Sequence, residues 1–503
     1  MAQLDKPNLV LSLAASYDTR GFDGYTNVVT NAQDQRKINS MYQPIVNAIT
    51  GRATLRLAKR PGLKDSGNTV GSAGEIQYLI ETLSAAGGTP WVITKNGNTT
   101  RACDLAAGAN TILNNSAYFP VFVDKTLISG TETVVVQLRH TNGDLSTVQK
   151  IYFASAIGTW TEITDADFTA LFPMGKAEHL DGFMLVLTST NKVQNSDLNS
   201  LANWTATSSI AKQIQQDRPM GLMRLGRIIL ACGATTMEGF YNAGNISGSP
   251  LGRIPQLSQR IGLAPCAQVG GLNCRHYYTT LGKRLYFAGS QEGVNASLAQ
   301  GIYSFDGSSV EKVSTLAIDS ILGEVGPTHI CSIAVAGRFA IAVALSAATT
   351  ATQRWLMYFP DWKEWFEWDS GYCQPANNGV WFLGIGTGTP ATKVGYMGDL
   401  TNYLDGTATA YTMTHQFKLP SKGNHRKFMP VCGVIGDTQT SASNLTVEFS
   451  DDDYQSFSTG RTIDLTSQKK QLYRCGSYRD RAVRLTHSAN TDCRLEAFVA
   501  TVK

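Results

Sequence analysis

Hydrophobic residues along this chain gather in short runs, and several of these runs follow a glycine. Four of them begin alike, with a small or apolar residue, often a polar one, and then a glycine that leads into a strand-like segment. These glycines are Gly182, Gly226, Gly282 and Gly337, and they lie 44, 56 and 55 residues apart. A recurrence of this length exceeds one hairpin and matches a four-stranded propeller blade. The pattern therefore predicts a repeated β module.

A second landmark keeps step with the glycines. Residues 354–359 and 364–368 are rich in aromatic side chains and flank Pro360-Asp361-Trp362-Lys363, and proline presets the φ angle that a turn requires. Cross-strand pairs in such a hairpin contribute roughly 0.2–1 kcal/mol each. Residues 301–313 follow the same plan, and Phe305 precedes Phe359 by 54 positions. The glycines and the aromatic hairpins recur at about the same spacing, which favours a true repeat.

The pattern changes along the chain. Residues 1–65 show little periodicity, residues 74–84 suit either a short helix or a buried strand, and residues 91–153 carry strand runs separated by Asn-Gly and Ser-Gly pairs, which are hairpin signals. Beyond residue 405, polar and apolar positions alternate as in half-buried antiparallel strands. The clearest of these segments are 411–417, 445–449, 482–485 and 495–499.

We therefore predict an all-β chain with three parts. Residues 1–65 would form an irregular N-terminal arm, residues 66–405 a β-propeller, and residues 406–503 a C-terminal platform domain resembling a β-sandwich.

Composition agrees with many short strands joined by turns. Charged residues make up only 16% of the 503 residues, there are 47 glycines, and the net charge of +4 is too small to indicate nucleic-acid binding by itself. The nine cysteines are odd in number and never spaced as CxxC, which argues against a disulfide framework or zinc knuckle and favours reduced, buried thiols. We find neither a secretory signal nor an apolar run long enough to span a membrane.

Motifs of common enzymes are not found. There is no phosphate loop, no HExxH and no GxSxG, and the glycines of residues 384–388 miss the spacing of a dinucleotide loop. The seven histidines are dispersed, so structural or surface roles are expected for them. We assign no catalytic, cofactor-binding or metal-ligating residue and expect no cofactor.

Two polar segments allow alternatives. Residues 450–457 resemble a degenerate Asp-box, a structural turn of sialidase-type propellers, with Tyr454 in place of glycine and Phe457 in place of tryptophan; the alternative is a Ca²⁺ site built on the carboxylates of residues 451–453. Basic side chains also cluster, either as a solvated rim or protein contact, or as a surface facing nucleic acid. These basic residues are Lys418, Lys422, His425, Arg426, Lys427, Arg474, Arg479, Arg481 and Arg484.

An ordered set of short motifs resembles the tail hub, or stabilisation (tail nozzle), proteins of short-tailed, podovirus-type bacteriophages. The set begins with Asn39-x-x-Tyr42 and residues 57–63, continues with residues 196–199 and Trp204, and includes residues 236–244. Arg260-Ile261-Gly262, residues 313–318 and the Ser-Asp-Asp element before an arginine-rich strand complete it. Residues 66–180 are less recognisable, so an insertion is expected there.

The resemblance implies a β-propeller with a β-sandwich platform, in a structural virion protein of the tail. Such a chain would form a homo-oligomeric ring, expected to be a hexamer, that extends the DNA channel below the portal and adaptor. The ring would retain packaged DNA, which passes through without sequence-specific contact, until DNA ejection. It would also dock tail spikes, fibres or a needle, and it would be assembled in the host cytoplasm.

Two other functions remain open at this point. A propeller enzyme acting on glycans needs paired carboxylates, for which Asp361, Glu364 and Glu367 are candidates by proximity in sequence, although they fit better on the outer face of the aromatic hairpin. A cytoplasmic scaffold propeller that binds peptides is the third interpretation. We expect a protein that is not an enzyme.

Overall fold

The structure is a computed structural model of the 503-residue chain, and it separates into two compact units. Unit 1 comprises residues 1–64, 356–370 and 397–503, and unit 2 comprises residues 65–355 and 371–396. The residues described are 9–13, 36–46, 53–69, 75–81, 90–104, 110–140, 149–215, 217–264, 277–291, 301–345, 353–370, 374–375, 381–383, 393–398, 400–405, 409–420 and 425–503.

Unit 2 begins with four antiparallel sheets, each made of four strands that pair in chain order. The first sheet contains β6 (Glu75–Glu81), β7 (Pro90–Asn96), β8 (Thr99–Asp104) and β9 (Asn110–Asn114). The second contains β10 (Tyr118–Ile128), β11 (Thr131–His140), β12 (Lys150–Ala154) and β13 (Thr161–Glu162). After the short helix α2 (Ala166–Thr169), the third contains β14 (Pro173–Leu180), β15 (Phe183–Thr188), β16 (Lys192–Ser196) and β17 (Trp204–Ala211). The fourth contains β18 (Pro219–Leu225), β19 (Ile228–Gly233), β20 (Met237–Asn242) and β21 (Leu251–Gln259).

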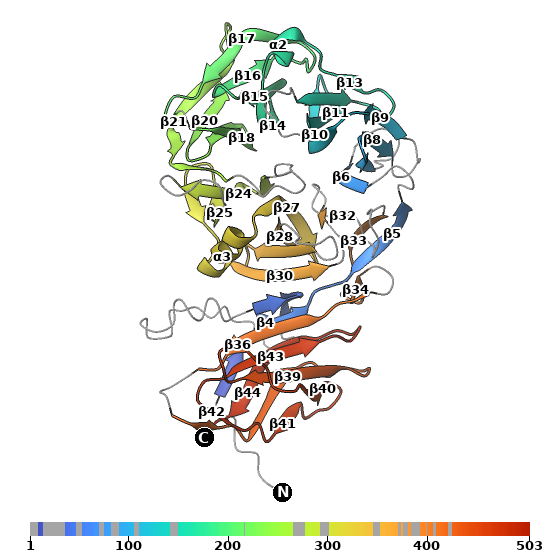
Figure 1. Ribbon diagram of the computed structural model, residues 1–503, viewed down its shortest axis with the longest axis vertical. Helices are drawn as coiled ribbons and strands as arrows, with labels where there is room; N and C mark the ends of the chain where they lie inside the picture. Colours follow the sequence, from blue (N-terminus) through green and yellow to red (C-terminus); the bar gives the residue numbers. More distant parts are fainter. Residues whose placement is uncertain are drawn as a thin grey trace. The chain divides into compact units, whose positions relative to one another are not determined.

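The remaining sheets of unit 2 continue the series, and the last one joins strands from both ends of the unit. The fifth sheet contains β22 (Ile261–Leu263), β23 (Tyr278–Leu281), β24 (Arg284–Gln291), β25 (Gly301–Phe305) and β26 (Val310–Lys312). Helix α3 (Leu316–Glu324) leads to the hairpin of β27 (Pro327–Val335) and β28 (Arg338–Leu345). The last sheet contains β31 (Gln374–Pro375), β32 (Trp381–Leu383), β33 (Lys393–Met397) and the early strand β5 (Leu63–Thr69). Figure 1 shows these sheets following one another around a ring, which is the architecture of a β-propeller.

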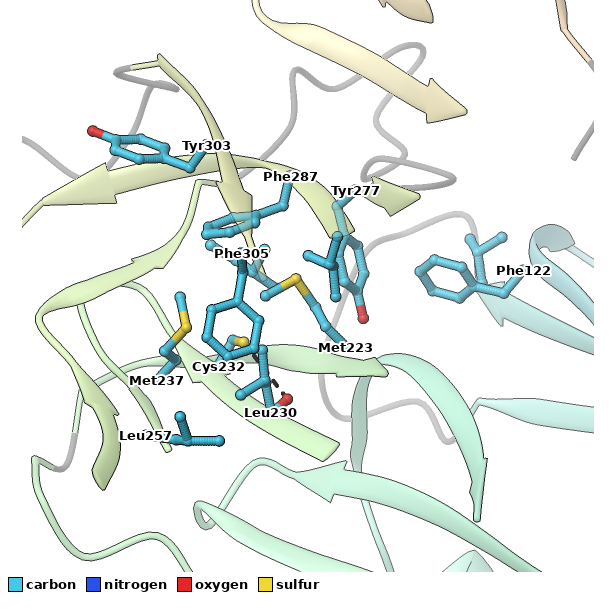
Figure 2. Packing of buried hydrophobic residues seen from close by; sticks show 13 residues of the cluster. Phe122, Met223, Leu230, Cys232, Met237, Leu257, Tyr277, Phe287, Tyr303 and Phe305 are labelled. Atoms are coloured by element: carbon cyan, nitrogen blue, oxygen red, sulfur yellow. Dashed lines mark hydrogen bonds between the residues drawn. The ribbon is translucent and has the colours of Figure 1, made fainter. Parts of the chain in front are cut away.

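The apolar core of unit 2 lies between neighbouring sheets. One cluster joins the first sheet to the second, another the second to the third, and another the third to the fourth. The cluster in Figure 2 includes Met223 and Leu230 of the fourth sheet and Phe287 and Phe305 of the fifth, all fully buried. Because each blade buries apolar side chains against the next, the blades stabilise one another around the ring.

The four glycines that predicted the repeat lie in equivalent places, which confirms the repeated module. Gly182, Gly226 and Gly337 lie in the two-residue turn between the first and second strands of their sheets, Gly282 lies in the two-residue turn between β23 and β24, and each has a positive φ. Gly182 and Gly337 take the second position of the turn, after Asp181 and Ala336, which also have positive φ, as in a type I′ turn. Gly226 and Gly282 instead take the first position, where type II′ turns require glycine.

The first strands share a further feature that the sequence did not reveal. Five of them have a break in pairing register near their start, which bends and twists the strand. These breaks lie between Ile76 and Tyr78, Pro120 and Phe122, Met174 and Glu178, Pro219 and Gly221, and Pro327 and His329.

Unit 1 contains two larger sheets, and each brings together strands from distant parts of the chain. One sheet contains β1 (Leu9–Ser12), β3 (Ser40–Val46), β4 (Ala53–Lys59), β44 (Arg494–Thr501), β38 (Val431–Gly436) and β41 (Gln471–Tyr473). The other includes β30 (Glu364–Ser370), β2 (Arg36–Ile38), β36 (Met413–Lys418), β43 (Ala482–His487), β39 (Asn444–Ser450) and β40 (Arg461–Asp464). Two small ladders pair β34 (Leu404–Asp405) with β35 (Thr409–Ala410) and β37 (Lys427–Phe428) with β42 (Ser477–Tyr478). Phe417 of β36 meets Phe498 of β44 with ring centroids 5.3 Å apart, so the two sheets pack face to face as in a sandwich.

The predicted hairpin of aromatic residues is confirmed. The chain passes from unit 2 into unit 1 within β29 (Gln353–Phe359), and β30 follows after a turn. Phe359 packs against Trp362 and Phe366, with ring centroids 5.0 and 5.6 Å apart.

Two expectations about the chain's division need correction. Residues 1–65 are not an irregular arm where they are described, because β1, β3 and β4 belong to one sheet of unit 1 and β2 pairs with β36 in the other. Accordingly, residues 406–503 supply only part of unit 1. The described residues from 75 to 162 form two four-stranded sheets of the same kind as those that follow, and the insertion expected within residues 66–180 stays a prediction. Residues 75–81, left open as helix or strand, form β6.

Candidate functional site

A cluster of charged and polar side chains lies on strands of three sheets in unit 2, and we call it the inner cluster. It consists of Asp124 of β10, Lys176, Glu178 and His179 of β14, and Tyr278 of β23. The Lys176 ammonium forms ion pairs with Asp124 and, at 3.3 Å, with Glu178, and the Tyr278 hydroxyl donates to Glu178. Lys176, Glu178 and His179 are buried, whereas the Asp124 side chain remains 32% exposed.

Burial and charge act against each other in the inner cluster. Burial raises the pKa of Glu178 despite the attraction of Lys176. For Lys176, burial would lower the pKa, but Asp124 and Glu178 outweigh it and the pKa is raised. His179 has a pKa lowered to about 4 by burial, so it is neutral at physiological pH. The ammonium is thus held as a charge between two carboxylates.

This arrangement links strands of three different sheets, and both of its carboxyl groups are engaged in these contacts. A glycosidase needs one carboxyl group that reaches the leaving oxygen and another that faces the sugar ring. Asp124 and Glu178 instead share one ammonium, and Glu178 is almost completely buried. The inner cluster was not predicted from the sequence, because the run from Lys176 to His179 has the polarity of an exposed strand.

A second cluster of buried polar residues lies in unit 1 around Arg60, and we call it the Arg60 cluster. Arg60 lies just after β4 and is only 1% exposed. Its Nη1 and Nη2 donate to the two carboxylate oxygens of Asp405 at 2.9 and 2.7 Å. The remaining donors reach the Asn39 side-chain oxygen and the carbonyl oxygens of Pro61 and Asp369, each at 3.0 Å. All five N–H groups of the guanidinium are therefore paired.

Aromatic rings and a close backbone approach complete the Arg60 cluster. The guanidinium carbon lies 3.8 Å from the centroid of the Tyr411 ring and 5.6 Å from that of Trp368, which is cation–π geometry. At Gly62, a Cβ atom would lie 2.1 Å from the carbonyl oxygen of Leu404, so this position accepts no side chain. Asn39 adopts a φ of +53° and anchors the cluster through its side chain.

The three carboxyl groups considered for glycan chemistry do not form a pair. Glu364 accepts from Lys37 at 2.7 Å, and Glu367 accepts twice from Arg36 at 2.8 Å. Both partners come from β2, so the two glutamates fasten this N-terminal strand to β30. Asp361 lies in the turn before β30.

Residues 450–457 form a turn braced by their own side chains, as the Asp-box interpretation predicted. Ser450 Oγ donates to Asp452 at 2.7 Å and accepts from the Tyr454 N–H at 2.9 Å, while the Ser456 N–H donates to Asp452 at 2.9 Å. Asp453 and Tyr454 both have positive φ. Among the described residues, no group of three or more His, Cys, Asp or Glu side chains is placed to hold a metal ion.

Several of the clustered basic residues serve internal contacts. Arg481 pairs with Asp451 at 2.7 Å through two N–H groups, and Arg484 pairs with Glu448 at 2.6 and 2.9 Å. Lys427 donates to the carbonyl oxygen of Arg479 at 3.1 Å. Lys422 lies outside the described residues. Part of the basic charge is thus neutralised within unit 1.

The described part of the chain has no helix that is long and apolar enough to cross a membrane.

Comparison with known proteins gives likeness of fold only. No family model and no curated protein sequence matches the chain. Among solved structures, the BBS1N chain of a complex with ARL6DN is similar with a TM-score of 0.41 and 10% identity, over 67% of this chain and 98% of that one. The β-propeller domain of the Trilobed protease from Pyrococcus furiosus has a TM-score of 0.34 and 12% identity, over 68% and 95%. An exo-β-1,3-galactanase from Phanerochaete chrysosporium has a TM-score of 0.28 and 11% identity, over 92% and 100%. At these levels the likenesses say nothing of what this chain does.

Proposed function

We propose that this protein is a structural subunit of a bacteriophage tail, namely of a ring-shaped hub or nozzle below the portal and adaptor. In this role, six copies would surround the DNA channel, help to retain the packaged DNA and provide a platform for spikes, fibres or a needle. The subunit would act through rigid surfaces and would need no chemical step.

One observation carries the proposal: residues of the family-like motifs hold the framework of both units. Asn39 and Arg60, from the two N-terminal motifs, meet in the Arg60 cluster at 3.0 Å, although 21 positions separate them. Motifs that are kept because they stabilise a fold are expected where distant segments meet, since a buried arginine needs all its partners. The position of these two motif residues in the Arg60 cluster therefore supports an architecture shared with the tail hub proteins.

The motifs in unit 2 have similar positions. Glu238 is fully buried and accepts the backbone N–H groups of Gln213 and Ile214 at 2.8 and 2.6 Å, which fastens the connection after β17 to β20. Ser196 accepts the N–H of Met184 at 3.0 Å, and Trp204 packs on Phe168 with centroids 4.9 Å apart. These residues brace blades, as a rigid scaffold requires.

The test is assembly. The purified protein would be examined by light scattering for mass and by negative-stain electron microscopy, alone and with a portal–adaptor complex of a short-tailed phage that encodes it. A sixfold ring, or a collar docked on the adaptor end of the portal, is the expected result. A monomer that does not bind the portal–adaptor complex would contradict the proposal.

The same preparation separates the two other functions. Release of reducing sugar from a panel of polysaccharides by a stable monomer would establish the glycan-degrading enzyme. Binding of peptides by a monomer that ignores both portal and polysaccharide would indicate the scaffold propeller.

A further inference from the structure

Two buried cysteines of unit 1 face each other. Cys432 lies in β38, Cys475 lies between β41 and β42, and their sulfur atoms are 3.5 Å apart. Cys432 is 1% exposed and Cys475 is 5% exposed. Other described cysteines have different neighbours: Cys103 contacts the Thr94 hydroxyl, and Cys232 contacts the carbonyl oxygen of Leu230. In the Cys432–Cys475 pair each thiol contacts a second thiol, which these other cysteines do not.

The backbone holds both cysteines in place. Cys432 pairs with Leu472 in the ladder between β38 and β41. The Cys475 N–H donates to the carbonyl oxygen of Met429 at 3.0 Å, and the Met429 N–H donates to Gly476 at 2.8 Å. A disulfide requires the sulfurs to be about 2.05 Å apart, so an approach of about 1.5 Å would join them.

Positive charge near Cys475 favours its reactive form. The hydrogen bond with Cys432 lowers the pKa of the Cys475 thiol, and the guanidinium groups of Arg461 and Arg481 act in the same direction. Arg481 also donates to the carbonyl oxygen of Cys475. The thiolate is the species that attacks a disulfide, so Cys475 is suited to react first.

A short edge strand gives the pair access to solvent. β41 spans only Gln471–Tyr473 and lies at the end of its sheet as described. Short edge segments open more readily than central strands. Transient opening of β41 would therefore expose Cys475 without unfolding the rest of unit 1.

We propose that Cys432 and Cys475 form a modification site, at which a small-molecule disulfide such as oxidised glutathione converts them into an intrachain disulfide. The Cys475 thiolate attacks one sulfur of the oxidant, whose S–S bond breaks and releases one glutathione thiolate. That thiolate takes up the proton of Cys432, and the Cys432 sulfur then attacks Cys475 and releases the second glutathione. The protein loses two electrons and two protons in total, and the oxidant becomes two thiols. The new bond joins β38 to the connection after β41, whichever function the protein has.

The test uses the full-length protein, purified under reducing conditions and then exposed to oxidised glutathione. Free thiols are blocked by alkylation, and tryptic peptides are analysed by mass spectrometry. The expected product is a cross-link between residues 428–461 and 475–479, two hydrogen masses lighter than the separate peptides. Its rate of formation should rise between pH 6 and pH 8, because the thiolate fraction rises.

Two variants make the result specific. Cys475→Ser should abolish the cross-link and leave Cys432 open to alkylation. Cys331→Ser removes a buried cysteine of β27 and should leave the cross-link unchanged. The proposal is overturned if both cysteines of the native protein are still alkylated after prolonged exposure, or if Cys432 and Cys475 link to other cysteines instead.

Discussion

Whether burial lowers the pKa of a basic side chain in this protein depends on how many hydrogen-bonding and ionic partners that side chain has. Arg60 pairs all five of its N–H groups and stacks on Tyr411, and its pKa stays above the ordinary value although burial opposes the charge. Lys59, its neighbour in sequence, donates to the carbonyl oxygen of Ala489 and lies over two tyrosine rings. Burial lowers the pKa of Lys59 to about 8. The planar guanidinium suits a buried joint better than the ammonium does.

His415 is buried without hydrogen-bond partners, and this makes unit 1 sensitive to acid. The residue lies in β36 at 0% exposure, stacks on Phe417, and neither ring nitrogen has a hydrogen-bond partner. Burial, helped by the charge of Lys37, lowers its pKa to about 3. The unfolded chain takes up a proton below about pH 6.5, whereas the folded chain does not until about pH 3. Acidification across this window therefore favours unfolding, by about 2 kcal/mol at pH 5.

The variant His415→Leu should lose this part of the pH dependence. We expect the difference in free energy of unfolding between pH 7 and pH 5 to shrink by about 2 kcal/mol relative to the unmodified protein. The measurement is urea unfolding at both pH values, followed by tryptophan fluorescence. Thr414→Val, which changes the neighbouring residue of the same strand, serves as control and should behave like the unmodified protein. Equal pH dependence of His415→Leu and the unmodified protein would show that His415 has the same pKa in the folded and the unfolded chain, and would contradict the prediction.

Individual strands of unit 2 are joined by a tyrosine whose hydroxyl fits between two glycines. The Tyr277 hydroxyl accepts from the N–H of Lys176 at 2.9 Å and donates to the carbonyl oxygen of Leu222 at 2.8 Å. A Cβ atom at Gly221 would lie 2.3 Å from this hydroxyl, and one at Gly175 would lie 2.8 Å from it. β14 and β18 thus approach closely because neither carries a side chain at these positions.

Gly221→Ala should destabilise unit 2 strongly. The new methyl group would displace the Tyr277 hydroxyl and leave the Lys176 N–H and the Leu222 carbonyl unpaired, at roughly 1–3 kcal/mol for each buried group. Denaturant unfolding measures the loss. In α3, Gly323→Ala meets no atom within 4 Å and is the matched control, with a neutral effect or a gain of up to about 1 kcal/mol.

A double-mutant cycle tests whether Gly221→Ala destabilises the protein by displacing the Tyr277 hydroxyl. Tyr277→Phe removes the hydroxyl, so Gly221→Ala should cost less in that background, although the ring carbon Cζ still lies 2.9 Å from the new Cβ. We expect a coupling free energy of about 1 kcal/mol or more. Strictly additive effects would mean that the methyl group acts through something other than the hydroxyl.

What could be predicted from sequence at this scale depended on local signals. The glycine turns and the hairpin of residues 354–368 were predictable because their turn residues and strands are adjacent in sequence. The breaks in register near Gly175 and Gly221 were not, since they depend on which strand lies alongside. For the same reason the inner cluster was missed: only the fold brings Asp124, Lys176 and Tyr278 together.

At the scale of the whole molecule, both units are built from segments far apart in sequence. In unit 2, β5 pairs with β33 and joins the start of the ring to its end. In unit 1, β2 pairs with both β30 and β36, and β4 pairs with β44. The N-terminal strands lack clear alternation, and Pro44 lies within β3, which is tolerated because β3 is an edge strand among the described residues. Pairing between segments far apart in sequence produces no local pattern, so residues 1–65 were predicted to form an irregular arm.

This organisation predicts that residues 406–503 do not fold alone. The fragment would lack β2 beside β36 and β4 beside β44, and Tyr42 and Leu57, which are at most 1% exposed in the whole protein, would no longer cover its core. Isolated sheets that lose their neighbours and their apolar cover are not independently stable. We expect the fragment to show no cooperative unfolding transition by circular dichroism and poorly dispersed amide resonances.

Restoring the N-terminal strands should rescue the fold. A chain that joins residues 1–64, 356–370 and 397–503 through flexible linkers regains β1–β4, β30 and the ion pair between Arg60 and Asp405, and it should recover a cooperative transition. In that chain, Asp405→Ala would leave a buried guanidinium without its carboxylate, which typically costs about 3–5 kcal/mol, and should abolish the transition again. A well-folded 406–503 fragment would instead mean that the C-terminal residues form a complete domain to which the N-terminal strands only add. The Arg60 cluster would then not be needed to hold unit 1 together.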